Sequence, residues 1–225
     1  TAMVDLNNDG LLDLIVTTAG LADQFYRQKP DNTFELMNSA WSIPTIQDES
    51  WGVIAADFDN DGDKDIYFSN GGFSGAEVNV LIRNDLNTLG KFTDVSATSG
   101  ACNLMVANFG GTTFDYDNDG DLDLYVLNNA FRAISTFDLS KNLRHKRDLY
   151  GGDKLYRNDG GVFKDVSEIT GIYGSVIGFG LGLMVADVNN DNWMDIYVAN
   201  DFFERDYLYI NNQDGTYKEQ LEEMI

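Results

Sequence analysis

The sequence predicts an all-β protein, a β-propeller of four-stranded antiparallel blades. Three observations carry this prediction. An aspartate-rich loop of nine residues occurs four times, every copy runs directly into an apolar strand, and a hairpin pattern follows each strand. The loops begin at residues 5, 57, 115 and 187, and repeats of this length are typical of propellers and related arrays.

Each repeat is expected to supply four strands. The first is a strand of small residues before the loop, as at residues 51–56 and 181–186, and the second follows the loop, as at 66–68 and 124–126. Glycine and alanine suit the first strand because propeller blades converge around a central channel. The third and fourth strands form a hairpin of a β-branched or aromatic run, a turn and an alternating run, at residues 25–35, 81–95, 155–166 and 208–219.

The pattern divides the chain into one propeller segment, residues 1–225, with repeats at about 1–50, 51–106, 107–179 and 180–225. Helical periodicity is confined to 139–147 and 218–224. The third repeat is lengthened by an insertion at 131–152, which contains a basic cluster. Two interpretations of this cluster are a solvated loop or helix cap that leans on an acidic neighbour, and an element that docks a partner. Its members are Lys141, Arg144, His145, Lys146 and Arg147.

Composition narrows the function classes. The 225 residues are 43% hydrophobic, which favours a globular protein, and the formal net charge is −22. Nucleic acids and anionic membranes require clustered Lys and Arg, so neither is expected as a partner. No apolar run approaches the roughly 18 residues of a membrane span. The single cysteine, Cys102, permits no internal disulfide and is expected to be a buried, inert thiol. Because the chain opens with Thr1, we expect a mature or excised segment.

The repeated loop reads Asp-x-Asp/Asn-x-Asp-Gly/Asn-x-x-Asp, which places oxygen atoms at alternate positions. That arrangement suits Ca²⁺, which takes six to eight oxygen ligands. We predict up to four structural Ca²⁺ ions, held by side chains at positions one, three, five and nine and by the backbone carbonyl at position seven. The predicted ligands are Asp5, Asn7, Asp9, Leu11 and Asp13; Asp57, Asp59, Asp61, Asp63 and Asp65; Asp115, Asp117, Asp119, Asp121 and Asp123; and Asp187, Asn189, Asp191, Trp193 and Asp195.

Details of the loops refine this prediction. Position seven must offer its backbone, since Leu11 and Trp193 have no side-chain oxygen. Position six is glycine, or Asn192 in the fourth loop, because the chain turns sharply there. An EF-hand is excluded because its position-twelve glutamate is replaced by apolar strand residues. The alternative is a set of aspartate-rich turns without metal, most plausible for loops 1 and 4, where Asn7 and Asn189 replace a carboxylate. Loop 4 is expected to be the weakest site.

The loops, together with the segment 155–167 (LYRNDGGVFKDVS), resemble FG-GAP/VCBS repeats, which form the propeller of integrin α subunits and of many secreted bacterial proteins. The segment 199–212 is similar to bacterial ASPIC/UnbV-type surface or secreted proteins related to cartilage acidic protein. The resemblance implies a calcium-bearing propeller that acts at the cell surface, outside the cell or in the periplasm. It also implies a cut from a longer chain, whose complete propeller has about seven blades.

The leading functional hypothesis is a non-catalytic scaffold for adhesion, protein–protein interaction or surface assembly, with a protein or glycan ligand. No GxSxG, HExxH or phosphate-binding loop is present, and residues 72–75 only approximate a nucleophile turn. Two alternatives stay open: a carbohydrate-binding or polysaccharide-lyase-type propeller, and a propeller subordinate to a distant catalytic domain. The carbohydrate alternative assigns sugar stacking to five aromatic residues, and the competing interpretation is that they pack between blades. They are Trp41, Trp51, Tyr116, Tyr173 and Trp193.

Overall fold

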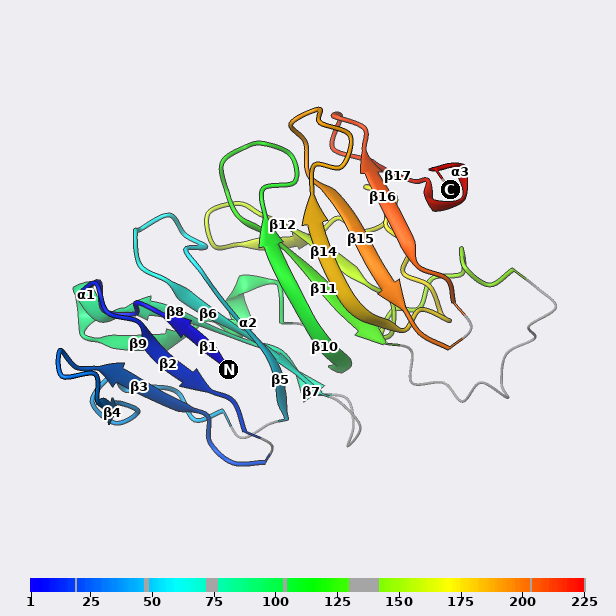
Figure 1. Cartoon of the computed structure of the whole chain (residues 1–225). Helices are drawn as coiled ribbons and strands as arrows, with labels where there is room; N and C mark the ends of the chain where they lie inside the picture. The colour runs from blue at the N-terminus through cyan, green and yellow to red at the C-terminus, as the bar shows by residue number, and fades with distance from the viewer. Residues whose placement is uncertain are drawn as a thin grey trace.

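The chain folds into four antiparallel sheets that stand side by side (Figure 1). The computed structural model describes residues 1–18, 20–46, 49–71, 77–102, 105–129, 142–202 and 204–224. The predicted all-β class and the four-stranded blades are confirmed. Two features named in the sequence analysis, Lys141 of the basic cluster and residues 72–75, lie outside the described residues.

We call the sheets blades 1 to 4, and in each the strands follow one another as an antiparallel meander. Blade 1 contains β1 (Ala2–Val4), β2 (Asp13–Val16), β3 (Gln24–Gln28) and β4 (Phe34–Leu36). Blade 2 contains β5 (Ser50–Ala56), β6 (Asp65–Asn70), β8 (Val80–Asp85) and β9 (Lys91–Asp94). Blade 3 contains β10 (Met105–Phe114), β11 (Asp123–Asn129), β12 (Lys154–Asn158) and β13 (Phe163–Asp165). Blade 4 contains β14 (Gly180–Ala186), β15 (Asp195–Asn200), β16 (Tyr207–Asn211) and β17 (Tyr217–Glu219).

The four blades share one register. The residue after position nine of each loop pairs with an equivalent residue of the third strand, in the pairs Leu14–Tyr26, Ile66–Ile82, Leu124–Tyr156 and Ile196–Tyr209. A one-residue slip would turn every apolar side chain to the opposite face, so this shared register fixes which face each side chain covers.

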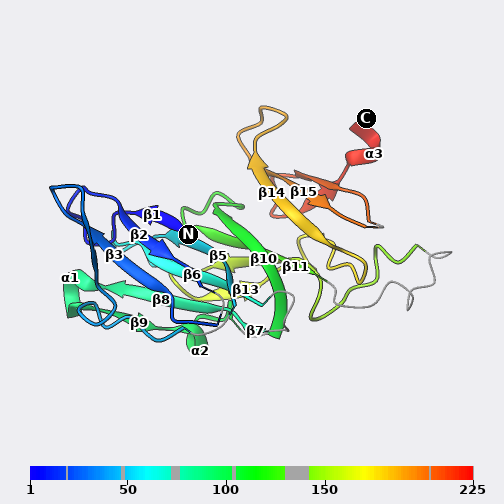
Figure 2. The same ribbon diagram turned by 60° about the horizontal axis from the view of Figure 1, so that its bottom comes forward.

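Consecutive blades meet through their first strands, with β1 against β5, β5 against β10 and β10 against β14. The approach is close, because a Cβ atom on Gly52 would lie 3.1 Å from the Cα atom of Gly110. This explains the small residues of these strands. Figures 1 and 2 show blades 1 and 4 at opposite ends, so the described blades form an open row. Membership in a larger propeller of about seven blades stays a prediction.

Three hydrophobic clusters fill the spaces between blades 1 and 2, 2 and 3, and 3 and 4. In the second strands, Ile66 faces the preceding blade and Tyr67 faces the next one, and both are fully buried. Burying one such side chain contributes about 1.5–3 kcal/mol. Tyr197, the equivalent of Tyr67 in blade 4, is only half-buried, since no described blade follows it.

Short elements complete the fold. The two-residue strand β7 (Glu77–Val78) leaves repeat 2 and pairs with β10, which gives the sheet of blade 3 a fifth strand. The helices α1 (Leu86–Leu89), α2 (Ser96–Ser99) and α3 (Leu221–Met224) have four residues each. Helix α3 falls within the predicted segment 218–224. The helix predicted at 139–147 is wrong for its described part, since residues 142–147 form a turn and an isolated bridge.

Candidate metal centres

The four aspartate-rich loops occupy equivalent places in the four blades. Each joins the first strand to the second, so position one follows the inner strand and position nine is the first residue of the second strand. The four loops therefore lie along one edge of the row of blades (Figure 1).

Two left-handed residues fold each loop back on itself. Position six has a positive φ, as predicted, in Gly10, Gly62, Gly120 and Asn192. Position four is also left-handed, with φ between 57° and 61° in Asn8, Asn60, Asn118 and Asn190. Asparagine tolerates this conformation better than other side chains. The sequence held the signal for position four, an asparagine that is identical in all four copies, but its conformation was not predicted.

Backbone N–H groups hold the carboxylates in place. In loop 2 the Asp57 oxygens accept hydrogen bonds from the N–H groups of Asp61 (3.1 Å) and Gly62 (3.0 Å), and Asp61 accepts one from Asp63 (2.9 Å). The other three loops repeat these bonds. Positions one and five are therefore held by backbone hydrogen bonds within their own loop.

The carboxylate at position nine is buried at the start of the second strand. Asp65 accepts hydrogen bonds from the N–H of Phe58 (3.1 Å) and of Asn84 (2.8 Å), and Asp123 makes the equivalent pair of bonds. Burial nevertheless raises the pKa of both carboxyls to about 7, because loss of hydration outweighs the two hydrogen bonds and nearby aspartates add to the effect.

The residue at position three distinguishes loops 2 and 3 from loops 1 and 4, because it is an aspartate in the first two and an asparagine in the others. Oδ1 of Asp59 and Oδ1 of Asp117 are buried and have no hydrogen-bond partner. Burial and the neighbouring carboxylates raise the pKa of both groups. Side-chain oxygens converge within 4.8 Å of one another in two groups, Asp57, Asp59 and Asp61 in loop 2 and Asp115, Asp117 and Asp123 in loop 3. Within each group, the buried Oδ1 of Asp59 or Asp117 has no donor and lies among repelling carboxylates, which fits a hard cation such as Ca²⁺.

Loops 1 and 4 are less suited to a cation. The amide nitrogen of Asn7 donates to Oδ2 of Asp9 (3.1 Å), and that of Asn189 donates to Oδ2 of Asp191 (2.9 Å). An amide donor thus occupies one oxygen of the position-five carboxylate. Asp191 also accepts a bond from Gln213 (3.0 Å). Among the residues that the structure describes, three convergent carboxylates occur in loops 2 and 3 only. The roles of all twenty predicted ligands, including the carbonyls at position seven, stay predictions.

An asparagine in the third strand joins each loop to the next blade, and sequence reasoning missed it. The buried amide of Asn84 donates to the Leu6 carbonyl (2.8 Å), that of Asn158 to the Phe58 carbonyl (2.7 Å) and that of Asn211 to the Tyr116 carbonyl (2.9 Å). Each acceptor is position two of the preceding loop. The signal was an asparagine that stands three residues after a leucine in the hairpin strands of blades 2, 3 and 4.

A second recurring contact lies at the other end of the second strand. Asp153 accepts hydrogen bonds from the Asn128 N–H (3.2 Å) and the Tyr125 hydroxyl (3.2 Å), and burial raises its pKa to about 7. In blade 2 the uncharged Asn79 takes this place, where it accepts a bond from Asn70 N–H (2.9 Å) and donates one to the tyrosine hydroxyl (2.7 Å). These groups brace the fold away from the loops.

The described part of the basic insertion packs on its own chain. Arg144 forms a 2.6 Å ion pair with the buried Glu204, and Arg147 donates to the Ile172 carbonyl (2.7 Å). The His145 ring stacks edge-to-face on Tyr173, with 4.9 Å between the ring centres. This agrees with the interpretation of a loop that leans on an acidic neighbour, but not with the helix.

Most of the aromatic candidates are core residues. Trp41 and Tyr116 are buried in the inter-blade clusters, and Tyr173 packs against one of them. Trp193 is half-buried, whereas Trp51 is 44% exposed. Packing between blades therefore explains three of the five.

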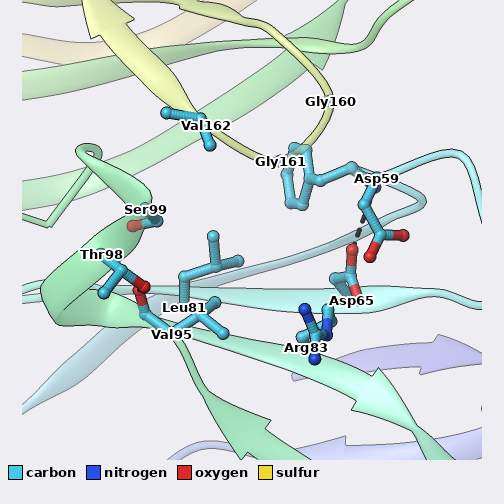
Figure 3. A pocket seen from close by; sticks show the side chains of 11 residues that line it. Asp59, Asp65, Leu81, Arg83, Val95, Thr98, Ser99, Gly160, Gly161 and Val162 are labelled. Carbon is cyan, nitrogen blue, oxygen red and sulfur yellow. Dashed lines mark hydrogen bonds between the residues drawn. The ribbon is translucent and has the colours of Figure 1, made fainter.

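A cavity of about 190 Å³ lies between blades 2 and 3, beside loop 2 (Figure 3). Asp59, Asp65 and Arg83 line one part, and Thr98 and Ser99 line another. Both hydroxyls donate to backbone carbonyls of helix α2 and the residue before it, so neither is paired with a base. The nearby Cys102 is buried, and burial raises its pKa to about 12, as expected for an inert thiol.

Four antiparallel blades, each with an acidic loop between its first two strands, define a propeller-type repeat protein. Residues 5–68 and 146–198 match the model of the FG-GAP-like repeat, and together they make up more than half of the chain. The chain therefore belongs to the FG-GAP-like repeat family, as its loops and hairpins indicated.

Among curated proteins, the chain is similar to cartilage acidic protein 1 of Xenopus tropicalis. The two are 26% identical over 151 residues, which cover 64% of this chain and 23% of the relative. The similarity thus concerns about a quarter of the longer protein. The helices of the described chain, at four residues each, are too short to cross a bilayer.

Proposed function

We propose that this chain is a calcium-stabilised, non-catalytic propeller scaffold that acts outside the cytoplasm and presents its blades to a protein or glycan ligand. One observation carries the proposal: the unpartnered buried oxygens of Asp59 and Asp117, each among convergent carboxylates. Leaving such acceptors unsatisfied costs about 1–3 kcal/mol each, and a bound Ca²⁺ ion would satisfy them.

The proposed location follows from the ion. Extracellular calcium modules work at dissociation constants of roughly 10⁻⁴ to 10⁻³ M, where free calcium is abundant. A chain that depends on such loops is suited to the cell surface, the extracellular space or the periplasm. The net charge of −22 also favours surroundings that supply cations, because the loops repel themselves when no cation is bound.

The scaffold role is supported by the chemistry of the described residues. The hydroxyls of the cavity beside loop 2 are bonded to backbone carbonyls, and the buried thiol of Cys102 is held in its protonated form. Repeats of this family are typically non-catalytic scaffolds. No observation favours the carbohydrate alternative, since three of its five aromatic candidates belong to the packing between blades.

Removal of calcium is the first test. Thermal unfolding in EDTA is expected at a lower Tm than in CaCl₂, because each site contributes about 2.7 kcal/mol when free calcium is 100-fold above its dissociation constant. The variant Asp59→Asn/Asp117→Asn, which gives loops 2 and 3 the asparagine of loops 1 and 4, should lose most of the calcium-induced rise in Tm.

Asp31→Asn is the matched control, because this aspartate is exposed and lies outside the loops. Its calcium-induced rise in Tm should equal that of the unaltered chain. Superimposable melting curves in EDTA and CaCl₂ for the unaltered chain would contradict the proposal.

A further inference from the structure

Side chains at position four of two loops reach the loop of the next blade. The amide nitrogen of Asn8 donates to Oδ1 of Asp63 at 2.6 Å, and that of Asn60 donates to Oδ1 of Asp121 at 2.6 Å. The acceptor in both cases is position seven. Loop 1 is thus tied to loop 2, and loop 2 to loop 3, by the same bond.

Each acceptor is also held by its own blade. Oδ1 of Asp63 accepts a second bond from the Asn87 amide (2.7 Å), and Oδ2 of Asp121 accepts one from the Gly160 N–H (2.9 Å). Asp63 is only 5% exposed. Hydrogen bonds to a charged acceptor are about twice as strong as neutral ones, and burial of Asp63 shelters the first bond, whereas the Asn60–Asp121 bond lies at the surface. Each acceptor is thus held from two sides, by the link from the preceding loop and by its own blade.

Both ends of each link lie among the predicted cation ligands. Asn60 stands between Asp59 and Asp61, in the left-handed turn of loop 2, while Asp121 is predicted to offer its backbone carbonyl to the ion of loop 3. An ion in loop 3 would fix Asp121 and, through the link, the turn that shapes loop 2. The next ion then meets a loop that is already ordered, which lowers the entropy cost of binding.

The junction between loops 3 and 4 lacks the link. Position seven of loop 4 is Trp193, which has no acceptor, and Asn118 makes no side-chain hydrogen bond within the described chain. The other connection across this junction, from Asn211 to the Tyr116 carbonyl, is present at 2.9 Å. This junction is therefore an internal control for the link itself.

We infer that the Asn8–Asp63 and Asn60–Asp121 bonds couple cation binding in loops 1, 2 and 3, so that an ion in one loop raises the affinity of its neighbour, whereas loop 4 binds independently. The inference rests on the proposed calcium function and deepens it. Coupling between sites is typically about 5- to 150-fold in affinity and is reciprocal. A single hydrogen bond should lie at the lower end of that range.

The test compares the same substitution at two loops. Asn60→Gly and Asn118→Gly both remove a position-four amide and keep the left-handed turn, but only the first breaks a link. In calorimetric titrations with CaCl₂, Asn60→Gly should weaken the apparent affinity about fivefold and flatten the cooperative isotherm. Asn118→Gly should stay within about twofold of the unaltered chain, since its loss is local. Far-ultraviolet circular dichroism confirms that both variants fold.

A gain-of-link variant removes any dependence on lost stability. Trp193→Asp supplies the missing acceptor for Asn118 and should bring loop 4 into the cooperative phase, and the addition of Asn118→Gly should abolish that gain. Equal isotherms for Asn60→Gly and Asn118→Gly would overturn the coupling and leave the proposed function intact. Failure of the unaltered chain to bind calcium would overturn both.

Discussion

Asp153 shows how one side chain can introduce a pH dependence that its equivalent avoids. Its carboxyl is buried and accepts two hydrogen bonds from β11, yet burial raises its pKa to about 7. Asn79, at the same place in blade 2, satisfies the same two partners without a charge. Because the carboxyl titrates near 4 in an unfolded chain, the folded form binds its proton more tightly.

The sign of this effect predicts the behaviour of Asp153→Asn. Below about pH 4 the carboxyl is protonated in both states, so its favourable contribution is fully present. As the pH rises to about 7 the unfolded chain ionises first, and that contribution is lost. Asp153→Asn should therefore match the unaltered chain at pH 4 and exceed its free energy of unfolding at pH 8 by on the order of a few kcal/mol, measured by urea unfolding.

Asp159→Asn makes the same change of charge at an exposed position. It should leave the difference between pH 4 and pH 8 unaltered. If Asp153→Asn keeps the pH profile of the unaltered chain as well, the buried carboxyl does not have the raised pKa.

At the level of elements, the third strand of each blade from 2 to 4 carries the asparagine that fastens it to the preceding loop. Asn158 is fully buried in β12 and donates to two carbonyls, those of Phe58 (2.7 Å) and Leu122 (3.0 Å). One bond joins two blades, and the other joins β12 to loop 3 of its own blade. The asparagine thus holds the acidic edge of the blade in place.

Asn158→Ala should lower the free energy of unfolding by about 1–3 kcal/mol for each carbonyl left without its donor. Chemical unfolding by urea in EDTA measures this loss apart from calcium. Asn212→Ala, which removes an exposed amide bonded only to Thr216 within the described chain, should cost much less. Equal losses for the two variants would refute the role assigned to Asn158.

Elements that depend on local pattern could be predicted, but contacts between distant segments could not. The loops, the strand order and the small first strands follow from residues close together in sequence. The Asn158–Phe58 bond joins residues 100 apart, so no local pattern reveals it. The helix expected at 139–147 fails in its described part because Arg144 and Arg147 are engaged by Glu204 and the Ile172 carbonyl, contacts that periodicity does not contain.

Across the whole molecule, the net charge is −22, and 16 of the 37 acidic residues belong to the four loops at one edge of the row. Their carboxylates are close enough to repel one another at low ionic strength, where the screening length is about 30 Å at 0.01 M. Bound divalent ions or dissolved salt would relieve this repulsion.

Salt should therefore stabilise the calcium-free protein more than the calcium-loaded one. Raising NaCl from about 0.01 M to about 0.5 M in EDTA should raise the Tm, because the screening length falls several-fold. The same change in saturating CaCl₂ should raise it less. KCl at equal ionic strength should act like NaCl. A Tm in EDTA that is insensitive to salt would show that repulsion among the loops does not limit stability.

The pairing of β7 with β10 makes the second and third repeats inseparable in one respect. Glu77 and Val78 come from repeat 2 but complete the sheet of blade 3. Exchange of whole repeats between proteins of this family would split that sheet if the crossover fell between residues 78 and 105. Chimeras joined within the β9–α2 connection would inherit a mismatched edge strand, whereas junctions before β5 or before β14 would keep every sheet intact.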